Sequence, residues 1–392
     1  NASWLSNRLA RYGILTLYHK ILPDELNSIV RAIKQASEEA ELVVLTGGLG
    51  PTEDDLTRQA LSELVQAPLV LHQHSLERII AFLKKRGRAM PLSTRTQAMY
   101  PQGTEVLENQ YGTATGIKLQ FAKAIIIALP GVPYEMKAMF EKEIIPLFPA
   151  KPANFILTRT VNIFGLSEAE VAERLGKLMQ RNQNPLVGIT VSEGIISACI
   201  RSDFPTQSVA QSELEKTAGQ IRSLLGMTVF SEGAETLHEV VGSLLLERGK
   251  TVATAESCTG GLVGKLLTDG PGASIYYKGG WIVYSNELKA KQLGVPLDML
   301  KREGAVSEQV TRYMAEQAVK LSSADYALAL SGIAGPSGGT QEKPVGTTWI
   351  ALASCKANKV KSFAQQYCFH GTRQQIRDRA AKTALNILRL EL

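Results

Sequence analysis

Three apolar, strand-sized segments of this chain each run into a glycine-rich loop. They span residues 41–46, 251–255 and 327–331, and a helix-like pattern follows the first two loops. In α/β folds such loops lie at the carboxyl ends of the strands, where ligands bind. The pattern therefore predicts α/β domains with parallel strands, and it predicts ligand sites at these three loops.

Hydrophobic periodicity along the 392 residues predicts three units, with boundaries at 1–150, 151–232 and 233–392. Pro146, Pro149 and Pro152 mark the first boundary, and the small α+β module after it carries no obvious chemistry. The predicted helices span residues 24–40, 54 onward, 75–86, 167–180, 206–225, 240–246, 307–321 and 374 onward. The predicted strands span residues 41–46, 124–129, 158–164, 186–201, 251–255, 280–284, 327–331 and 346–354.

Composition narrows the functional class. The four cysteines lie far apart without metal-type spacing, which favours buried thiols in a reducing cytoplasm. The net charge of +6 comes from scattered basic residues, so a small anionic ligand is favoured over nucleic acid. No apolar run approaches the roughly 18 to 20 residues of a membrane span. We therefore expect a soluble cytoplasmic protein, whose sequence here opens at Asn1 without Met.

The segment around Ser257 reads as strand, tight turn and helix. The amides of residues 258–261, which include Thr259, Gly260 and Gly261, would then form a free helix N-terminus for an anion or a developing oxyanion. The alternative is that Ser257 is a helix cap. None of the five histidines lies in a turn or glycine-rich setting, which disfavours a Ser–His–Asp triad.

Other side chains could complete this site. Tyr284 and Lys289, at and after the end of a strand, are candidate bases, although an exposed position on a helix is the plain alternative for Lys289. The third loop offers the Ser331 hydroxyl and the amides of Gly332 and Gly335 to a carbonyl or a phosphate. Near the start of the last helix, Arg373 and Arg377 could pair with a phosphate.

The loop of the N-terminal unit combines glycines with carboxylates. Gly47, Gly48, Gly50 and Thr52 precede Asp54 and Asp55, which lead a predicted helix. These carboxylates either interact with the helix dipole or hold a divalent cation such as Mg²⁺ against a diphosphate.

Together these segments resemble the CinA family (competence- and damage-inducible protein A). The C-terminal motifs are Glu256-Ser-Cys-Thr-Gly-Gly261, Tyr284-Ser-Asn286, Ser331-Gly-Ile-Ala-Gly-Pro336 and Pro344-Val-Gly-Thr347. The N-terminal motifs are Asn1-Ala-Ser-Trp-Leu5, Thr46-Gly-Gly-Leu-Gly-Pro-Thr-Glu-Asp-Asp55, Gly112-Thr-Ala-Thr-Gly116 and Pro130-Gly-Val-Pro-Tyr-Glu-Met136. Members of the family usually carry a strand and a Gly-Asp-Glu turn upstream of the position numbered 1 here, and more often have Thr where Ser331 stands.

The resemblance implies a homodimer with a molybdopterin-binding-like α/β domain at 1–150, a KH-like α+β module at 151–232 and a C-terminal α/β amidohydrolase domain at 233–392. The last would convert nicotinamide mononucleotide to nicotinate mononucleotide and ammonia in bacterial pyridine nucleotide salvage, with no cofactor. In that reaction Ser257 attacks, Lys289 and Tyr284 manage its proton, Ser331 positions or polarises, and Arg373 meets the charged substrate.

The same resemblance implies that the N-terminal domain hydrolyses ADP-ribose with a divalent metal at the loop 47–55. The competing interpretation is a non-catalytic protein that binds a pterin or nucleic acid in competence or DNA repair. A KH module holds nucleic acid with a Gly-x-x-Gly loop, and no such pair occurs between Phe155 and Phe230. This absence counts against nucleic acid as a partner.

Overall fold

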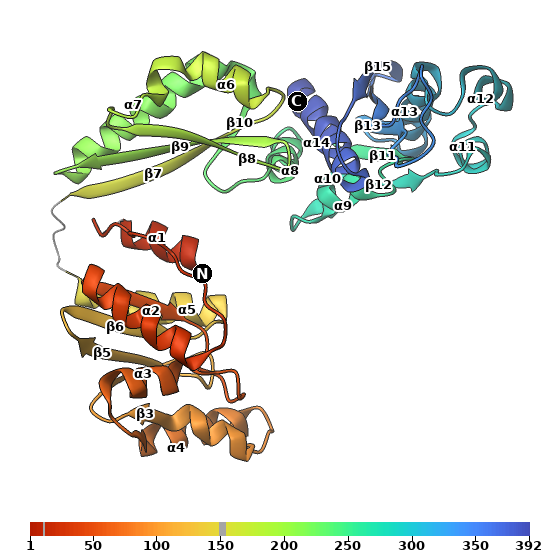
Figure 1. Cartoon of the computed structure of the whole chain (residues 1–392). Helices are drawn as coiled ribbons and strands as arrows, with labels where there is room; N and C mark the ends of the chain where they lie inside the picture. Colours follow the sequence, from red (N-terminus) through yellow and green to blue (C-terminus); the bar gives the residue numbers. More distant parts are fainter. Residues whose placement is uncertain (11, 149–153) are drawn as a thin grey trace. The chain divides into compact units, whose positions relative to one another are not determined.

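The computed structural model describes residues 1–10, 12–148 and 154–392, which form two compact units (Figure 1). Unit 1 contains Asn1–Ile156 with Phe204–Gln207, and unit 2 contains Leu157–Asp203 with Ser208–Leu392. The C-terminal part therefore shares a compact unit with most of the predicted middle module. Of the boundary prolines, Pro146 lies in a short 3₁₀ helix (Ile145–Leu147), while Pro149 and Pro152 fall outside the described residues.

Unit 1 is built on a four-stranded sheet between two layers of helices. The strand order is β1 (Leu42–Thr46), β6 (Ala124–Leu129), β5 (Gly116–Phe121) and β4 (Glu105–Leu107). One face packs on α2 (Leu26–Glu39) and α3 (Thr57–Val65), and the other on α1 (Ala2–Ala10) and α5 (Pro133–Met139). Beside this sheet lie α4 (Gln73–Lys85) and the pair β2 (Leu69–Leu71) and β3 (Met99–Pro101).

The prediction of parallel strands is correct here only for β1 and β6. The pairs β5–β6 and β4–β5 are antiparallel. The short connection between β5 and β6 forces this direction, because parallel neighbours need a crossover of a dozen or more residues. The helix predicted from residue 54 begins at Thr57.

Unit 2 begins with a four-stranded sheet in the order β10 (Val229–Glu232), β7 (Phe155–Ile163), β9 (Ile195–Phe204) and β8 (Leu186–Ser192). The apolar face of the sheet packs on α6 (Glu168–Leu175) and α7 (Gln207–Leu225). The strand predicted at 186–201 is in fact the hairpin β8–β9. Its turn places Glu193 and Gly194 at φ values of 50° and 81°, a left-handed conformation that reverses the chain.

The C-terminal domain contains a mixed five-stranded sheet. Its order is β12 (Tyr277–Ile282), β11 (Val252–Glu256), β13 (Tyr326–Gly332), β14 (Thr347–Lys356) and β15 (Lys359–Cys368). β12, β11 and β13 are parallel to one another, and β14 runs antiparallel to both of its neighbours, β13 and β15. β15 is absent from the sequence prediction, because an edge strand with many exposed side chains has no apolar run.

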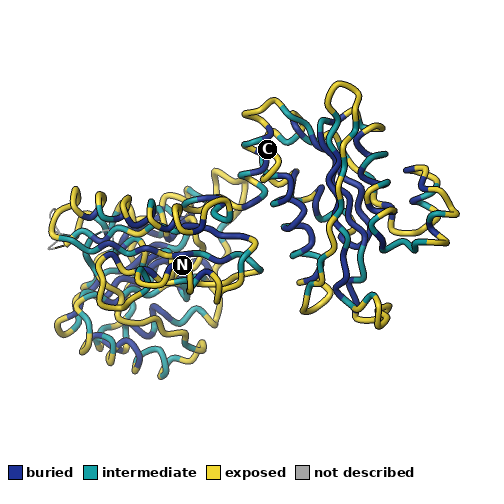
Figure 2. Tube along the Cα trace, turned by 90° about the horizontal axis from the view of Figure 1, so that it is seen from above, coloured by how far each residue is buried: buried dark blue, intermediate teal, exposed yellow. Residues whose placement is uncertain are grey.

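Helices cover both faces of this sheet. On one face lie α8 (Leu237–Glu247), α9 (Leu262–Thr268), α10 (Ala273–Tyr276) and α14 (Arg373–Glu391). On the other lie α11 (Asn286–Leu293), α12 (Leu297–Glu303) and α13 (Glu308–Ser322). β11 is buried throughout and β13 up to Ser331, whereas the edge strands β12 and β15 have many exposed residues; buried stretches are dark blue in Figure 2. Among the described residues, no helix is both long and apolar enough to span a membrane.

The sheet direction determines where a site can form. The parallel strands β11, β12 and β13 end at Glu256, Ile282 and Gly332, so the loops after them meet at one edge of the sheet. β15 ends at the same edge, because Cys368 pairs with Thr347 at the start of β14, and α14 begins just beyond it.

Candidate active site

Ser257 is the first residue after β11, which is fully buried between β12 and β13. The Ser257 amide donates to the Leu330 carbonyl at 3.0 Å, and the Gly260 amide donates to the Ser257 carbonyl at 3.1 Å. Gly260 and Gly261 close the turn at φ values of 60° and 93°, which favour glycine. Because α9 begins at Leu262, with Gly261 as its N-cap, Ser257 is not a helix cap.

Lys289 projects from α11 onto this serine. Lys289 and Leu293 are one turn apart and form the buried face of α11, whereas Lys291 is exposed. The Lys289 side chain is 1% exposed, and its Nζ lies 3.0 Å from Ser257 Oγ. Its other contacts are the carbonyl oxygens of Val283 at 2.9 Å and Tyr284 at 3.5 Å. The alternative of a solvent-facing lysine is therefore wrong.

Burial makes the charged form of Lys289 less favourable than in water. Burial lowers its pKa below the ordinary value, and the neighbouring Cys258 opposes this only in part. Burial also raises the pKa of the Cys258 thiol to about 12, so this cysteine stays protonated at neutral pH. In the described residues, no histidine contacts the Ser257 hydroxyl; in unit 2, His238 instead contacts Thr236.

The expectation of a free helix N-terminus after Ser257 needs correction. The Gly261, Val263 and Gly264 amides donate to the buried carboxylate of Glu256, at 2.9, 3.1 and 2.8 Å. The Gly260 amide donates to the Ser257 carbonyl. The amides of Gly260 and Gly261 are thus both bound within the protein and are unavailable to an external anion. Glu256 was not among the candidate residues predicted from the sequence, although its position at the end of an apolar strand, just before the serine, was a usable signal.

Tyr284 lies beside the contact between Lys289 and Ser257, because its carbonyl oxygen is 3.5 Å from Lys289 Nζ. Its side chain is 59% exposed, and its Oη lies 2.8 Å from Arg373 Nη2. Arg373 also donates through Nη1 to the Gly335 carbonyl at 2.6 Å. The structure therefore joins Tyr284, Arg373 and the loop after β13, whereas Lys289 is the candidate base that contacts Ser257.

Arg377, one turn further along α14, binds the turn after the serine. Its Nε and Nη2 donate to the carbonyls of Cys258 at 3.1 Å and Thr259 at 2.6 Å. Arg377 was predicted to pair with a phosphate. In the structure, its Nε and Nη2 are instead bound to the backbone.

Ser331 is buried at the end of β13. Its Oγ donates to the Ala305 carbonyl at 2.7 Å, in the connection between α12 and α13. Gly332 lies against β14, where an added Cβ would come within 2.6 Å of Thr348 Oγ1. The three residues Ser331, Gly332 and Gly335 thus border the same sheet edge as Ser257, with the Ser331 hydroxyl held by the backbone.

The N-terminal loop is held by its own hydrogen bonds. Thr57 Oγ1 donates to the Gly47 carbonyl, and buried Arg58 donates to the carbonyls of Leu49 and Gly50. The Asp55 carboxylate accepts from the amide and the hydroxyl of Thr52. Burial raises the Asp55 pKa, but these hydrogen bonds outweigh burial, so the net pKa lies below the ordinary value.

A pocket of about 570 Å³ opens beside this loop. Gly47 and Gly48 line it, together with mostly apolar residues of α1, α2, β1 and the segment 14–24; Gly50, Thr52, Asp54 and Asp55 do not. No group of three or more His, Cys, Asp or Glu side chains could hold a metal ion within the described ranges. Asp55 binds Thr52 through Oδ2, and the metal site on Asp54 and Asp55 and the hydrolysis of ADP-ribose both stay predictions.

Comparisons with known proteins cover the whole length of the chain. Residues 1–150 match the family described as a probable molybdopterin binding domain, residues 158–231 the damage-inducible protein CinA KH domain, and residues 234–392 the CinA C-terminal domain. A putative competence-damage inducible protein of Caldicellulosiruptor saccharolyticus is 39% identical over 389 residues, which cover 99% of this chain and 94% of that protein. The chain belongs to the CinA family.

Further proteins are similar to this chain. A putative competence-damage inducible protein of Symbiobacterium thermophilum is 39% identical over 399 residues, covering 99% of this chain and 93% of that protein. Among solved structures, the competence/damage inducible protein CihA of Agrobacterium tumefaciens is 37% identical. It covers 39% of this chain and 92% of its own, with a TM-score of 0.37.

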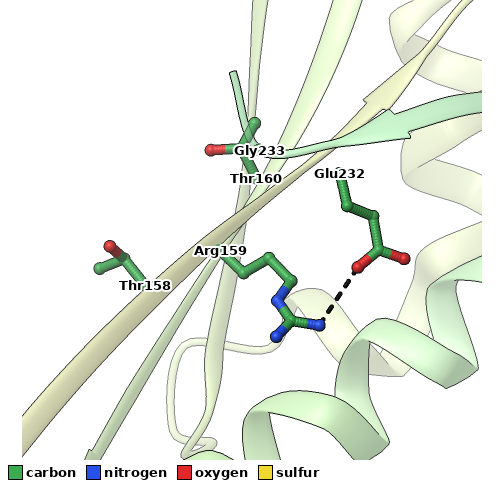
Figure 3. Close-up of a pocket in the computed structure, with 5 residues that line it drawn as sticks. All are labelled: Thr158, Arg159, Thr160, Glu232 and Gly233. Atoms are coloured by element: carbon green, nitrogen blue, oxygen red, sulfur yellow. Dashed lines mark hydrogen bonds and ion pairs between the residues drawn. The ribbon is translucent and has the colours of Figure 1, made fainter. Parts of the chain in front are cut away.

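The CinA KH region contains a second pocket, of about 420 Å³, lined by Thr158, Arg159, Thr160, Glu232 and Gly233 (Figure 3). Arg159 pairs with Glu232 at 3.2 Å and also with Glu215. The two charged side chains that line this pocket, Arg159 and Glu232, thus form an ion pair with each other. We therefore place the candidate chemistry at Ser257 and not in this pocket.

Proposed function

We propose that the C-terminal domain hydrolyses the carboxamide of nicotinamide mononucleotide to nicotinate mononucleotide and ammonia, with Ser257 as nucleophile and Lys289 as its base. The observation that carries the proposal is the 3.0 Å contact between Ser257 Oγ and the buried Nζ of Lys289. A serine hydroxyl becomes a nucleophile when a neighbouring group takes its proton, and a desolvated lysine is able to do so.

The contacts of Lys289 support this role. A neutral lysine amine has two N–H donors and one lone pair. In the structure Nζ is the donor to Ser257 Oγ and to the carbonyls of Val283 and Tyr284. In the proposed neutral amine, the two carbonyls would accept the two N–H groups, and the lone pair would face the Ser257 hydroxyl. The hydroxyl proton then points along the path of its own transfer.

In the proposed reaction, Ser257 Oγ attacks the carboxamide carbon as its proton passes to Lys289 Nζ. The tetrahedral intermediate collapses when Lys289 returns the proton to the amide nitrogen; the C–N bond breaks, and ammonia leaves an acyl-enzyme. Water then attacks the ester carbon while Lys289 accepts its proton. The acid product leaves as this proton returns to Ser257 Oγ.

The oxyanion of the intermediate requires donors close to the nucleophile. The amides of Gly260 and Gly261 are already bound within the protein. The amides of Cys258 and Thr259 face the neutral Cys258 thiol, which is a weak acceptor, and we assign the oxyanion to these two. The amide that follows a nucleophilic serine serves this purpose in other serine hydrolases.

For the other end of the substrate, Arg373 supplies a guanidinium that is bound to the Gly335 carbonyl and the Tyr284 hydroxyl. Its charge suits the phosphate of a mononucleotide. The competing interpretation, a non-catalytic binding protein, gives no reason for a buried lysine that contacts a serine hydroxyl, because burying an amine carries a large desolvation cost.

Ammonia release from nicotinamide mononucleotide tests the proposal. We expect the unsubstituted chain to release ammonia, and Ser257→Ala and Lys289→Met to lose at least about a thousandfold in kcat. Lys291→Met is the matched control, because it makes the same change on the exposed face of α11 and should keep the activity. Undiminished ammonia release by purified Ser257→Ala would exclude Ser257 as the nucleophile.

A further inference from the structure

The carboxylate of Glu256 collects the amides at the start of α9. Oε2 accepts from Gly261 and Val263, and Oε1 accepts from Gly264, all within 3.1 Å. The Glu256 side chain is 1% exposed, so these bonds are shielded from water. Gly264 suits this packing, because a Cβ there would come within 2.5 Å of the Tyr277 hydroxyl.

Glu256 makes these bonds as a buried acid without a basic partner. None of the ion pairs found in the described residues involves it. Its charge is balanced by amide dipoles at the positive end of α9. A neutral amide side chain cannot replace it, because its NH₂ group would face at least one of these N–H donors.

The bonds to Glu256 close the turn that carries Ser257. β11 ends at Glu256 and α9 begins at Leu262, so the carboxylate ties the residue before the turn to the residues after it. On the carbonyl side, Arg377 binds the oxygens of Cys258 and Thr259. The Glu256 carboxylate thus binds amides of this segment, and the Arg377 guanidinium binds its carbonyls.

The same strand end is connected to Lys289. The Glu256 carbonyl accepts from the Val283 amide at 2.8 Å, and the Val283 carbonyl accepts from Lys289 Nζ. The backbone of Glu256 therefore fixes the position of the base, while its side chain fixes the turn that carries the nucleophile.

From these contacts we infer that Glu256 is a positioning residue, which holds Ser257 Oγ in line with Lys289 Nζ through the amides of α9. The inference rests on the proposed function of Ser257 as the nucleophile. It assigns to Glu256 no contact with the substrate. A shift of the turn by about 1 Å would cost roughly a hundredfold in rate without weakening binding.

The test is Glu256→Gln in the full chain, with Glu239→Gln as the matched control. Glu239 also caps a helix of unit 2, because its carboxylate accepts from the Thr236 amide at 2.7 Å, and it lies in α8, outside the proposed site. We expect Glu256→Gln to lower kcat for nicotinamide mononucleotide about 10- to 100-fold with KM within about twofold. Because Glu239 is exposed and Gln also serves at this capping position, Glu239→Gln should keep both its thermal stability and its kcat.

A second readout does not depend on the substrate. A phosphonofluoridate labels a nucleophilic serine when Oγ attacks phosphorus and fluoride leaves, with the serine proton passing to the base. We expect the labelling rate of Ser257 to fall in Glu256→Gln by the same factor as kcat. If Glu256→Gln does not fold, Glu256→Asp carries the test, because it keeps the charge but shortens the reach to the amides.

The outcomes separate the two ideas. A chain that releases no ammonia refutes the proposed reaction, while the labelling rates still decide whether Glu256 positions Ser257. Unchanged kcat and unchanged labelling in Glu256→Gln would overturn the inference. Equal losses of kcat in Glu256→Gln and Glu239→Gln, in proportion to the unfolded fraction, would also overturn it, because Glu256 would then only stabilise the fold.

Discussion

The carbonyl oxygen of Val283 lies 2.9 Å from the Nζ of Lys289. Val283 directly follows β12, and its amide donates to the Glu256 carbonyl. A main-chain carbonyl thus holds the Lys289 amine in place. The direction of the amine toward Ser257 therefore does not depend on a second side chain. The position of the proposed base follows from the pairing of β12 with β11.

The first prediction concerns pH. Burial lowers the pKa of Lys289, and the reaction requires the free amine, which exists above that pKa. We therefore expect kcat/KM to decrease as the pH falls through the lowered pKa and to level off above it. Lys289→Arg stays charged at every accessible pH and should be inactive throughout. A flat profile for the unsubstituted chain, measured by ammonia release, would argue against Lys289 as the base.

The second prediction concerns the phosphate. Arg373 is assigned to the charged end of the substrate, so Arg373→Met should reduce kcat/KM for nicotinamide mononucleotide about 10- to 100-fold, the worth of a charge-assisted hydrogen bond. The same substitution should have little effect on nicotinamide riboside, which lacks the phosphate. Equal losses with both substrates would show instead that Arg373 acts through its contacts to Tyr284 and Gly335.

The third prediction concerns Ser331. Because its buried hydroxyl donates to the Ala305 carbonyl, Ser331→Ala leaves that carbonyl without its partner. We expect the free energy of unfolding to fall by about 1 to 3 kcal/mol and kcat by less than about tenfold. Urea denaturation and ammonia release measure the two effects. A loss of kcat beyond a hundredfold at unchanged stability would indicate that Ser331 contacts the substrate.

The fourth prediction concerns the N-terminal loop. The Asp55 carboxylate binds Thr52, whereas Asp54 is exposed, so Asp55→Asn should lower the free energy of unfolding of unit 1 by about 1 kcal/mol and Asp54→Asn should leave it unchanged. AMP release from ADP-ribose, with and without chelator, tests the activity implied by the resemblance. Release that persists in chelator and in both variants would contradict a metal site built on these aspartates.

Local patterns were sufficient for most elements. The continuous apolar run of β6 and the periodic spacing in α2 predict their type, because each buries side chains at its own period. Such patterns did not predict the antiparallel pairing in unit 1 or the edge strand β15. Both depend on which strand becomes the neighbour, and that is a property of the assembled sheet.

By itself, the sequence indicated that Ser257 lies in a glycine-rich turn after a buried strand, and that Tyr284 ends another predicted strand with Lys289 following it. Only the tertiary structure decided which of the two meets the serine. Lys289 does so because its place on α11 turns it inward with Leu293, whereas Tyr284 points to Arg373. The structure also decided that the start of α9 is occupied by Glu256, since amides and a carboxylate up to eight positions apart meet only when strand, turn and helix have packed.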